Sequence, residues 1–260
     1  MPFLTHKHAI VTGGGRGIGA AIASELARLG ASVTVMGRDA RALDQCAAYL
    51  TSEYRVRALP VVCDVSDETS IDGAFARSRE SLGEPYVLVN NAGQASGAAL
   101  PEMDRDMWDR MMAVNLTGPY LCTRAVLPAM IATGTGRIVN SASTAGLRGY
   151  ARLSAYCASK HGVIGLTRAL AQETAKAGIT VNAVCPGYTE DTSMVRQAVD
   201  GLMENLEISE EEAMEMMLRR SPRRSFVRQA EVANAVAWLC SPDATAITGQ
   251  AIAVAAGEVT

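Results

Sequence analysis

The sequence predicts a single α/β domain with a doubly wound parallel sheet of seven strands and helices on both faces. Three observations predict it. Short apolar runs, typical of buried strands, alternate with helical segments of about ten residues or more. A glycine-rich loop follows the first of these runs at once. No linker, internal repeat or low-complexity tract interrupts the chain, so we expect one domain over residues 1–260.

The elements follow in order. The expected strands are short apolar runs at residues 8–12, 32–36, 56–63, 86–89, 137–142, 179–185 and 250–254. The expected helices carry apolar residues three or four positions apart, at residues 20–29, 39–53, 67–82, 107–133, 154–177 and 232–240. Gly30 ends the first helix, and Asp39 opens the second. Pro119 and Pro128 are candidate kinks in the helix at 107–133. This pattern predicts a Rossmann-type domain.

One segment, Tyr188 to Phe226, lies outside this alternation. It is acidic and rich in methionine. It can be an ordinary amphipathic helix pair with methionine in its core. It can also be a mobile lid over a substrate pocket, because methionine surfaces adapt to varied apolar shapes. The two interpretations are compatible, and we expect residues 188–226 to form a helical substrate-binding lid.

Composition and charge exclude several classes of partner and site. The net charge is −3 and the pI is near 5.7, which does not suggest nucleic acid or an anionic membrane as a partner. The six cysteines form no CxxC pair and no zinc-ligand spacing, so we expect no metal site. No apolar stretch reaches the roughly 18 residues that span a membrane. A cytoplasmic protein is expected.

The glycine-rich loop has the sequence TGGGRGIG at residues 12–19 and stands between a strand and a helix. Glycines allow a tight turn and a close approach to a pyrophosphate, and the helix start adds unpaired N–H groups. This context turns a weak motif into a specific one. A plain glycine-rich turn is the alternative. The loop residues expected to bind a dinucleotide are Gly13, Arg16, Gly17, Ile18 and Gly19.

The residues after the second strand bear on which dinucleotide binds. A carboxylate there would accept hydrogen bonds from the ribose 2′-OH of NAD. The chain instead has Met36-Gly37-Arg38. Arg38 and Arg16 suit a 2′-phosphate, because arginine pairs with phosphate through two hydrogen bonds, so NADP(H) is favoured. Asp39 can also reach the ribose, which leaves NAD(H) open. Asp64, followed by Val65, can accept from the adenine amino group.

Ser143, Tyr156 and Lys160 form a second constellation. Tyr156 and Lys160 are four residues apart on one expected helix, so they face the same way. A neighbouring ammonium favours the phenolate, and we expect Lys160 to lower the pKa of Tyr156. Ser143 ends the fifth strand, where its hydroxyl can hold a substrate oxygen. Tyr156 can then donate a proton to that oxygen, or take one in the reverse direction.

At these residues the chain resembles the short-chain dehydrogenase/reductase family. Residues 12–19 resemble its TGxxxGxG loop, and residues 90–93 are similar to its NNAG segment. The resemblance implies catalytic roles for Asn115, Ser143, Tyr156 and Lys160. It also implies that Lys160 bonds the nicotinamide ribose and that Asn115 holds a water in a proton relay. Further cofactor contacts that it implies are Asn91, Ala92, Gly93, Pro186, Gly187 and Thr189. Members are commonly homotetramers.

Residues 134–187 look most like ketoreductases that act on β-keto acyl thioesters, including polyketide ketoreductases. The resemblance implies an NADPH-dependent reductase of a 3-oxoacyl thioester or a related polyketide or aromatic ketone. The chain departs from the family at 254–257, where Val-Ala-Ala-Gly replaces Val-Asp-Gly-Gly. This change bears on the subunit interface or the pocket floor.

Two other functions stay open at this point. One is an NAD-dependent dehydrogenase that oxidises a secondary alcohol in a degradative pathway. The other is a dinucleotide sensor without catalysis. Arg148 and Arg152 can serve a substrate carried on coenzyme A or a carrier protein, although ordinary surface charge also explains them. The expected substrate contacts are Gln94, Ser143, Tyr150 and Leu153.

Overall fold

The computed structural model describes residues 2–259, so residues 1 and 260 of the expected domain lie outside the described residues. Seven parallel strands form one sheet in the order β3-β2-β1-β4-β5-β6-β7, which confirms the predicted fold class. The strands are β1 (His8–Thr12), β2 (Ser32–Gly37), β3 (Ala58–Val62), β4 (Val87–Asn90), β5 (Gly136–Ser141), β6 (Ile179–Pro186) and β7 (Ala251–Val254). The strand order reverses between β1 and β4. In such sheets, ligands bind in the crevice beyond the carboxyl ends of the strands at that reversal.

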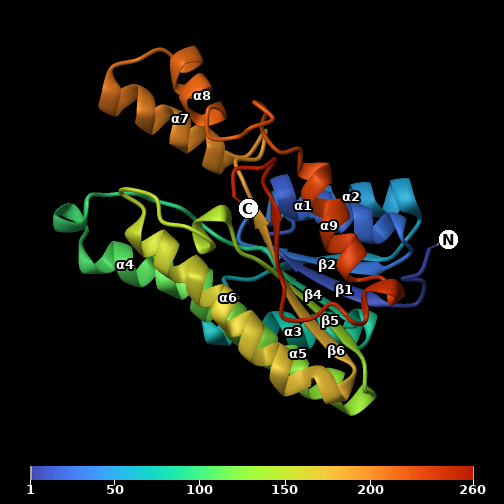
Figure 1. Ribbon diagram of the computed structural model, residues 1–260. Coiled ribbons are helices and arrows are strands. Elements are labelled where there is room, and N and C mark those ends of the chain that lie inside the picture. The colour runs from blue at the N-terminus through green and yellow to red at the C-terminus, as the bar shows by residue number, and fades with distance from the viewer. Residues whose placement is uncertain (1, 260) are drawn as a thin grey trace.

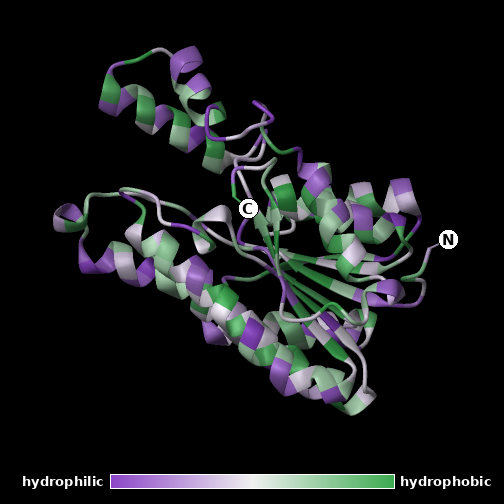
Figure 2. Cartoon of the chain, viewed as in Figure 1, coloured by the Kyte–Doolittle hydropathy of each residue, from purple (hydrophilic) through white to green (hydrophobic). Residues whose placement is uncertain are grey.

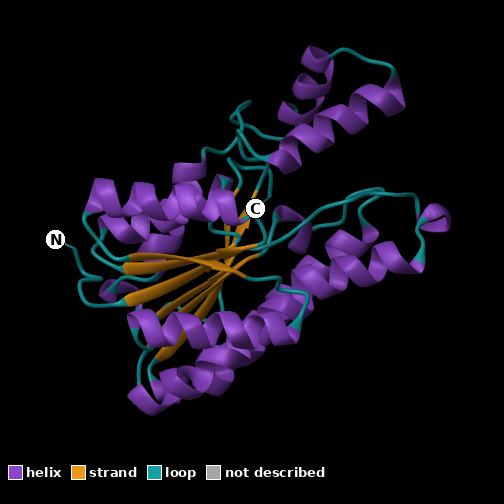
Figure 3. Ribbon diagram, turned by 180° about the vertical axis from the view of Figure 1, so that it is seen from behind, coloured by secondary structure: helices purple, strands orange, loops and turns teal. Residues whose placement is uncertain are grey.

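Helices cover both faces of the sheet, as Figures 1 and 3 show. The helices are α1 (Gly17–Arg28), α2 (Ala40–Tyr54), α3 (Glu68–Leu82), α4 (Arg105–Met112), α5 (Gly118–Thr133), α6 (Ser154–Thr174), α7 (Ser193–Leu206), α8 (Glu210–Leu218) and α9 (Gln229–Leu239). On one face α1, α2 and α9 bury an apolar cluster against the strands. On the other face α3, α5 and α6 bury a second cluster. Apolar strands are thus covered on both sides, which is why they read as continuous apolar runs.

The expected helix at 107–133 is interrupted, and the interruption does not lie at a proline. The backbone widens into a π turn at Ala113–Thr117, between α4 and α5. Pro119 stands in the first turn of α5, where a helix tolerates it, and only Pro128 lies inside. The turn contains Asn115, whose side-chain amide binds both backbone groups of Gln94. The irregular turn therefore coincides with a contact between Asn115 and a loop residue that is distant in the sequence.

The segment at 188–226 forms α7 and α8, which stand beyond the carboxyl ends of the strands (Figure 1). Their mixed polarity differs from the apolar strands (Figure 2). The pair has a small core of its own, made of Val195, Val199, Ala213 and Met217. Three further methionines are partly exposed: Met194, Met214 and Met216. No helix within residues 2–259 is both long and apolar enough to cross a membrane.

Candidate active site

A cavity of about 530 Å³ opens beyond the carboxyl ends of the strands. Its walls come from the glycine loop, from the segments after β4, β5 and β6, and from the first turns of α6 and α7. These are the segments in which the sequence places its candidate residues. The fold brings them together at the place where a doubly wound sheet binds its ligands.

The glycine loop forms one end of the cavity. Gly13 and Gly17 have φ values of +64° and +52°, in the left-handed region that favours glycine. A side chain on Gly19 is impossible without rearrangement, because its Cβ would lie 2.1 Å from the Gly13 carbonyl oxygen. The N-cap of α1, Arg16, makes no side-chain capping bond, which leaves the first amide groups of the helix available to an anion. The loop therefore fits a pyrophosphate.

The segment after β4 braces this loop. The hydroxyl of Thr12 accepts hydrogen bonds from the backbone N–H groups of Asn91 and Ala92, each at 3.0 Å. The Asn91 side chain donates to the Thr12 carbonyl at 3.1 Å. Asn91, Ala92 and Gly93 line the cavity beside the loop.

The two arginines near the expected ribose site differ in their surroundings. Arg16 forms an ion pair with Asp39, whose other oxygen caps α2 by accepting from the Ala42 N–H at 3.0 Å. That capping bond, followed by the charge of Arg16, lowers the pKa of Asp39. A cofactor phosphate bound by Arg16 would therefore share the guanidinium with the Asp39 carboxylate. Arg38 is exposed and does not line the cavity.

Asp64 and Val65, expected at the adenine, also lie outside the cavity lining. The Asp64 carboxylate accepts from the Ser66 hydroxyl at 2.6 Å and the Ser66 N–H at 2.9 Å. These bonds, with a smaller contribution from Arg38, lower its pKa. Val65 is buried, and its carbonyl oxygen lies 2.7 Å from where a Cβ on Gly118 would stand.

Ser143, Tyr156 and Lys160 all line the cavity. Tyr156 and Lys160 are 6% and 4% exposed. Burial raises the pKa of Tyr156 to about 12, and a hydrogen bond with Ser143 opposes this rise. Burial also lowers the pKa of Lys160 to about 8.

The expected lowering of the Tyr156 pKa by Lys160 is wrong for the protein alone. The Lys160 ammonium donates to the Ser141 carbonyl at 2.8 Å and lies 5.7 Å from the centroid of the tyrosine ring. The ammonium is therefore hydrogen-bonded to the end of β5. Desolvation of the phenolate outweighs it.

Asn115 is fully buried beneath this group and does not line the cavity. Its amide accepts from the Gln94 N–H at 3.0 Å and donates to the Gln94 carbonyl at 2.9 Å. A Cβ on Gly93 would lie 3.3 Å from the Asn115 carbonyl oxygen and 3.6 Å from Lys160 Nζ. Asn115 and Lys160 thus approach the same small space beside Gly93.

Among the expected substrate contacts, Tyr150, Leu153 and Ser143 line the cavity, but Gln94 does not. The Gln94 side chain donates to the Arg110 carbonyl at 3.1 Å, so it points toward α4. The structure does not support a substrate contact by Gln94, because its backbone and side chain are both occupied.

Pro186, Gly187 and Thr189, at the end of β6 and just after it, also line the cavity. The Thr189 hydroxyl donates to the Gly187 carbonyl at 3.0 Å. Met194 belongs to the methionine-rich segment, but its contact with the reacting group was not predicted: its sulfur accepts from the Tyr156 hydroxyl at 3.7 Å. The methionine-rich composition of 188–226 was its only signal.

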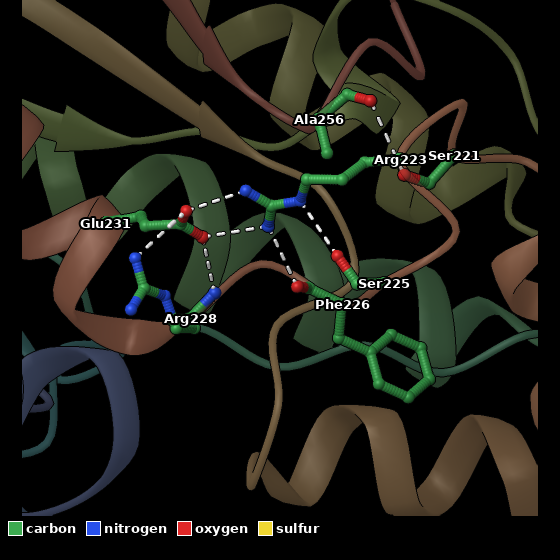
Figure 4. Close-up of polar contacts among 7 residues, drawn as sticks. All are labelled: Ser221, Arg223, Ser225, Phe226, Arg228, Glu231 and Ala256. Carbon is green, nitrogen blue, oxygen red and sulfur yellow. Dashed lines mark hydrogen bonds and ion pairs between the residues drawn. The ribbon is translucent and has the colours of Figure 1, made fainter.

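A polar network fastens the segment after α8 to α9 (Figure 4). Arg223 donates to both carboxylate oxygens of Glu231, at 2.7 and 2.9 Å. It also donates to the Ser225 hydroxyl and the Phe226 carbonyl. The Glu231 carboxylate in addition accepts from the Arg228 N–H at 2.8 Å. The hydrogen bonds from Arg223, followed by that from Arg228, lower the pKa of Glu231 to about 2.

The six cysteines are all buried free thiols. Within residues 2–259, no group of three or more His, Cys, Asp or Glu side chains is placed to hold a metal ion.

The sequence and the fold are similar to those of known proteins. A family model described as short chain dehydrogenase matches residues 7–202. A Streptomyces violaceoruber protein assigned as ketoacyl reductase 1 of the granaticin polyketide synthase is 42% identical over 252 residues, which cover 96% of this chain and 92% of that protein. The D-beta-hydroxybutyrate dehydrogenase of Rhizobium meliloti is 35% identical over 256 residues, covering 96% of this chain and 98% of its own. A crystal structure of an actinorhodin polyketide ketoreductase variant with NADPH superposes with a TM-score of 0.93 at 42% identity, covering 97% of each chain.

Proposed function

This chain belongs to the short-chain dehydrogenase family of nicotinamide-dependent oxidoreductases, and from that premise we propose that it is an NADPH-dependent ketoreductase. The proposed substrate is a 3-oxoacyl thioester or a related polyketide or aromatic ketone. The observation that carries the proposal is the convergence of Ser143, Tyr156 and Lys160 on one cavity beside the glycine loop. The similar ketoreductases support the substrate class.

The proposed chemistry assigns each residue a task. When bound, a reduced nicotinamide supplies a hydride to the carbonyl carbon. The glycine loop would hold its pyrophosphate, and Lys160 its ribose, while Pro186, Gly187 and Thr189 line the wall where the nicotinamide would lie. Ser143 donates a hydrogen bond to the carbonyl oxygen, and Tyr156 donates a proton to the same atom as negative charge develops there.

The acidity of Tyr156 favours this direction. With a pKa near 12, the phenol keeps its proton at neutral pH and is ready to donate it. Lys160, with a pKa near 8, remains mostly charged at pH 7 and can stabilise the phenolate left behind. We propose that Asn115, fixed by the Gln94 backbone, holds a water that resupplies the proton through Lys160.

Turnover of a ketone panel with NADPH tests the function. We expect consumption of NADPH with β-keto thioesters or aryl ketones. The second candidate is an NAD-dependent alcohol dehydrogenase, and the relative from Rhizobium meliloti favours it. Oxidation of 3-hydroxy acids with NAD, with no ketone reduction by NADPH, would replace the first proposal by the second.

Preference for NADPH is proposed on Arg16 and Arg38. Replacement of Arg38 by alanine should raise the KM for NADPH by about tenfold, since a charge-assisted hydrogen bond contributes roughly 1.5–3 kcal/mol, and leave the KM for NADH nearly unchanged. Arg77→Ala, at an exposed position of α3, is the matched control. Equal effects of Arg38→Ala on both cofactors would contradict the assignment.

Three further properties are proposed, the first on the methionine-rich composition of the segment and the other two on the family resemblance. The α7–α8 segment acts as a substrate lid, and Met194 is its contact with Tyr156. The protein assembles as a homotetramer, which light scattering can measure. The substrate can be bound to coenzyme A or a carrier protein. Of the arginines expected at the entrance, Arg152 pairs with Glu102 at 3.4 Å, and Arg148 lies 5.1 Å from the Tyr150 ring centroid.

A further inference from the structure

We infer that Glu258 is a positioning residue, which fixes Tyr150 and thereby the substrate-binding wall next to Ser143. The inference rests on the proposed ketone reduction for its kinetic consequence, but the contacts stand on their own. Glu258 lies just beyond the segment where the sequence departs from its family. Its carboxylate reaches Tyr150, a residue that lines the cavity.

The first contact is short and directed. The Tyr150 hydroxyl donates to the Glu258 carboxylate at 2.6 Å. Tyr150 lines the cavity, and its ring is therefore held from the carboxyl-terminal segment, more than a hundred positions away. Burial, followed by the hydrogen bond to Glu258, raises the pKa of Tyr150, so the phenol remains a donor.

The second contact of Tyr150 is with Thr144, next to the reacting group. The Tyr150 oxygen lies 2.9 Å from the Thr144 hydroxyl. A phenol has one proton and an ionised carboxylate only accepts. Tyr150 therefore donates its proton to the Glu258 carboxylate, and the Thr144 hydroxyl donates to the Tyr150 oxygen. Thr144 directly follows Ser143, whose own hydroxyl accepts from the Ala145 N–H at 3.1 Å. Glu258, Tyr150 and Thr144 thus hold together the part of the substrate wall that follows Ser143.

The backbone delivers the carboxylate to this place. Ala256 and Gly257 have φ values of +51° and +89°, and the Glu258 N–H donates to the Ala255 carbonyl at 3.0 Å. The chain therefore turns back sharply after β7. On the other side of the turn, the Ser221 hydroxyl donates to the Ala256 carbonyl at 3.4 Å (Figure 4). The segment is held between the substrate wall and the end of α8.

Two neighbouring residues complete the enclosure. The Arg220 guanidinium lies 5.3 Å from the Tyr150 ring centroid. Gly187 leaves the room that the carboxylate needs, since a Cβ there would stand 3.1 Å from Glu258 Oε2. Tyr150 is therefore confined at its hydroxyl and at its ring. Loss of the acceptor would free the ring to leave the wall.

Four variants test the role: Glu258→Ala, Glu258→Gln, Tyr150→Phe and the double variant of Glu258→Ala with Tyr150→Phe. We expect Glu258→Ala and Tyr150→Phe to raise the KM for an aryl ketone by about tenfold, with kcat and the KM for NADPH within about twofold of wild type. Glu258→Gln keeps a carbonyl acceptor and should restore a nearly wild-type KM. The double variant should be no worse than either single one, because both remove one interaction.

Glu204→Ala, on the exposed surface of α7, is the control and should behave as wild type. Unchanged KM in Glu258→Ala would overturn the inference. Failure of Glu258→Gln to restore KM would do so too, since charge rather than hydrogen bonding would then be at work. A double variant with additive losses would show two independent effects and also refute it.

Hydrogen exchange separates this inference from the proposed function. Exchange across residues 144–153 should accelerate in Glu258→Ala and Tyr150→Phe, and stay at the wild-type rate in Glu258→Gln. This readout needs no substrate. If wild type reduces no ketone, the proposed function fails while the exchange pattern still decides the inference. Identical exchange in wild type and in these three single variants would overturn the inference.

Discussion

At the scale of single residues, burial controls the acidity of the reacting group. Tyr156 and Lys160 are both almost fully buried, and burial moves their pKa values in opposite directions, to about 12 and about 8. Each shift favours the neutral form of its side chain. The phenol is thereby kept as a proton donor.

Replacement of Tyr156 by phenylalanine should lower kcat for ketone reduction by at least ~100-fold, the lower end for general acid–base catalysis. The ring stays in place, so the loss reports the hydroxyl. Steady-state turnover with NADPH measures it. Tyr120→Phe, at an exposed position on α5, should leave kcat unchanged. Wild-type turnover by Tyr156→Phe would refute the proposed acid.

At the scale of elements, irregular backbone and side-chain anchors shape the site more than the regular helices do. The π turn between α4 and α5 turns Asn115 toward the Gln94 backbone. Single π turns inside helices are frequent at functional sites. The α7–α8 pair, in contrast, has a small core of its own. Its position over the cavity therefore depends on its two ends.

Arg223→Ala tests the anchor at the second of those ends. Loss of its bonds to Glu231 and Phe226 should destabilise the α7–α8 segment locally, by a small amount because the ion pair is partly exposed. Hydrogen exchange in residues 188–226 should accelerate about fivefold, with little change in global Tm. Arg219→Ala removes an ion pair confined to the end of α8 and is the control. Equal acceleration in both variants would show that the anchor has no special role.

At the scale of the whole molecule, a buried polar network joins elements that are distant in sequence. His8 Nδ1 donates to the Gly83 carbonyl at 2.7 Å, because a carbonyl only accepts. His8 Nε2 therefore accepts from the Thr34 hydroxyl at 2.9 Å, with the Ser78 hydroxyl at 3.3 Å. The network ties β1 and β2 to α3 and to the loop after it. The imidazole in it is neutral, because desolvation of the buried ring disfavours the charged form.

Stability should therefore fall in mild acid. Desolvation lowers the pKa of His8 from 6.5 to about 4 in the folded protein. The unfolded chain binds this proton first, so stability is complete above pH 6.5 and decreases as the pH falls toward 4. The loss is up to about 3 kcal/mol. Glu231, with its pKa near 2, adds a further loss at lower pH, as its carboxylate is protonated.

Urea unfolding at several pH values between 7 and 4 measures this dependence. His8→Asn should be less stable at pH 7 and should show a flatter slope. His6→Asn is the control, because His6 is exposed with a φ of +63°, a conformation that asparagine tolerates. An unchanged slope in His8→Asn would assign the acid sensitivity to other groups.

The sequence by itself determined the elements and the motifs. Buried strands are apolar throughout and helices repeat every three or four residues, so the alternation was readable, and the expected strands agree with the observed ones to within about two residues. The glycine loop and the spacing of Tyr156 and Lys160 are local patterns as well. Each is decided by neighbours along the chain, and for that reason each was predicted.

The tertiary structure decided what depends on contacts between distant segments. It set the strand order with its reversal between β1 and β4, and it set the π turn at Asn115 through the Gln94 backbone. It turned the Gln94 side chain away from the cavity and placed Lys160 with Ser141, so that desolvation governs the pKa of Tyr156. It also brought Glu258 to Tyr150. Desolvation and hydrogen bonds across the fold arise only once the chain has packed, and no local pattern encodes them.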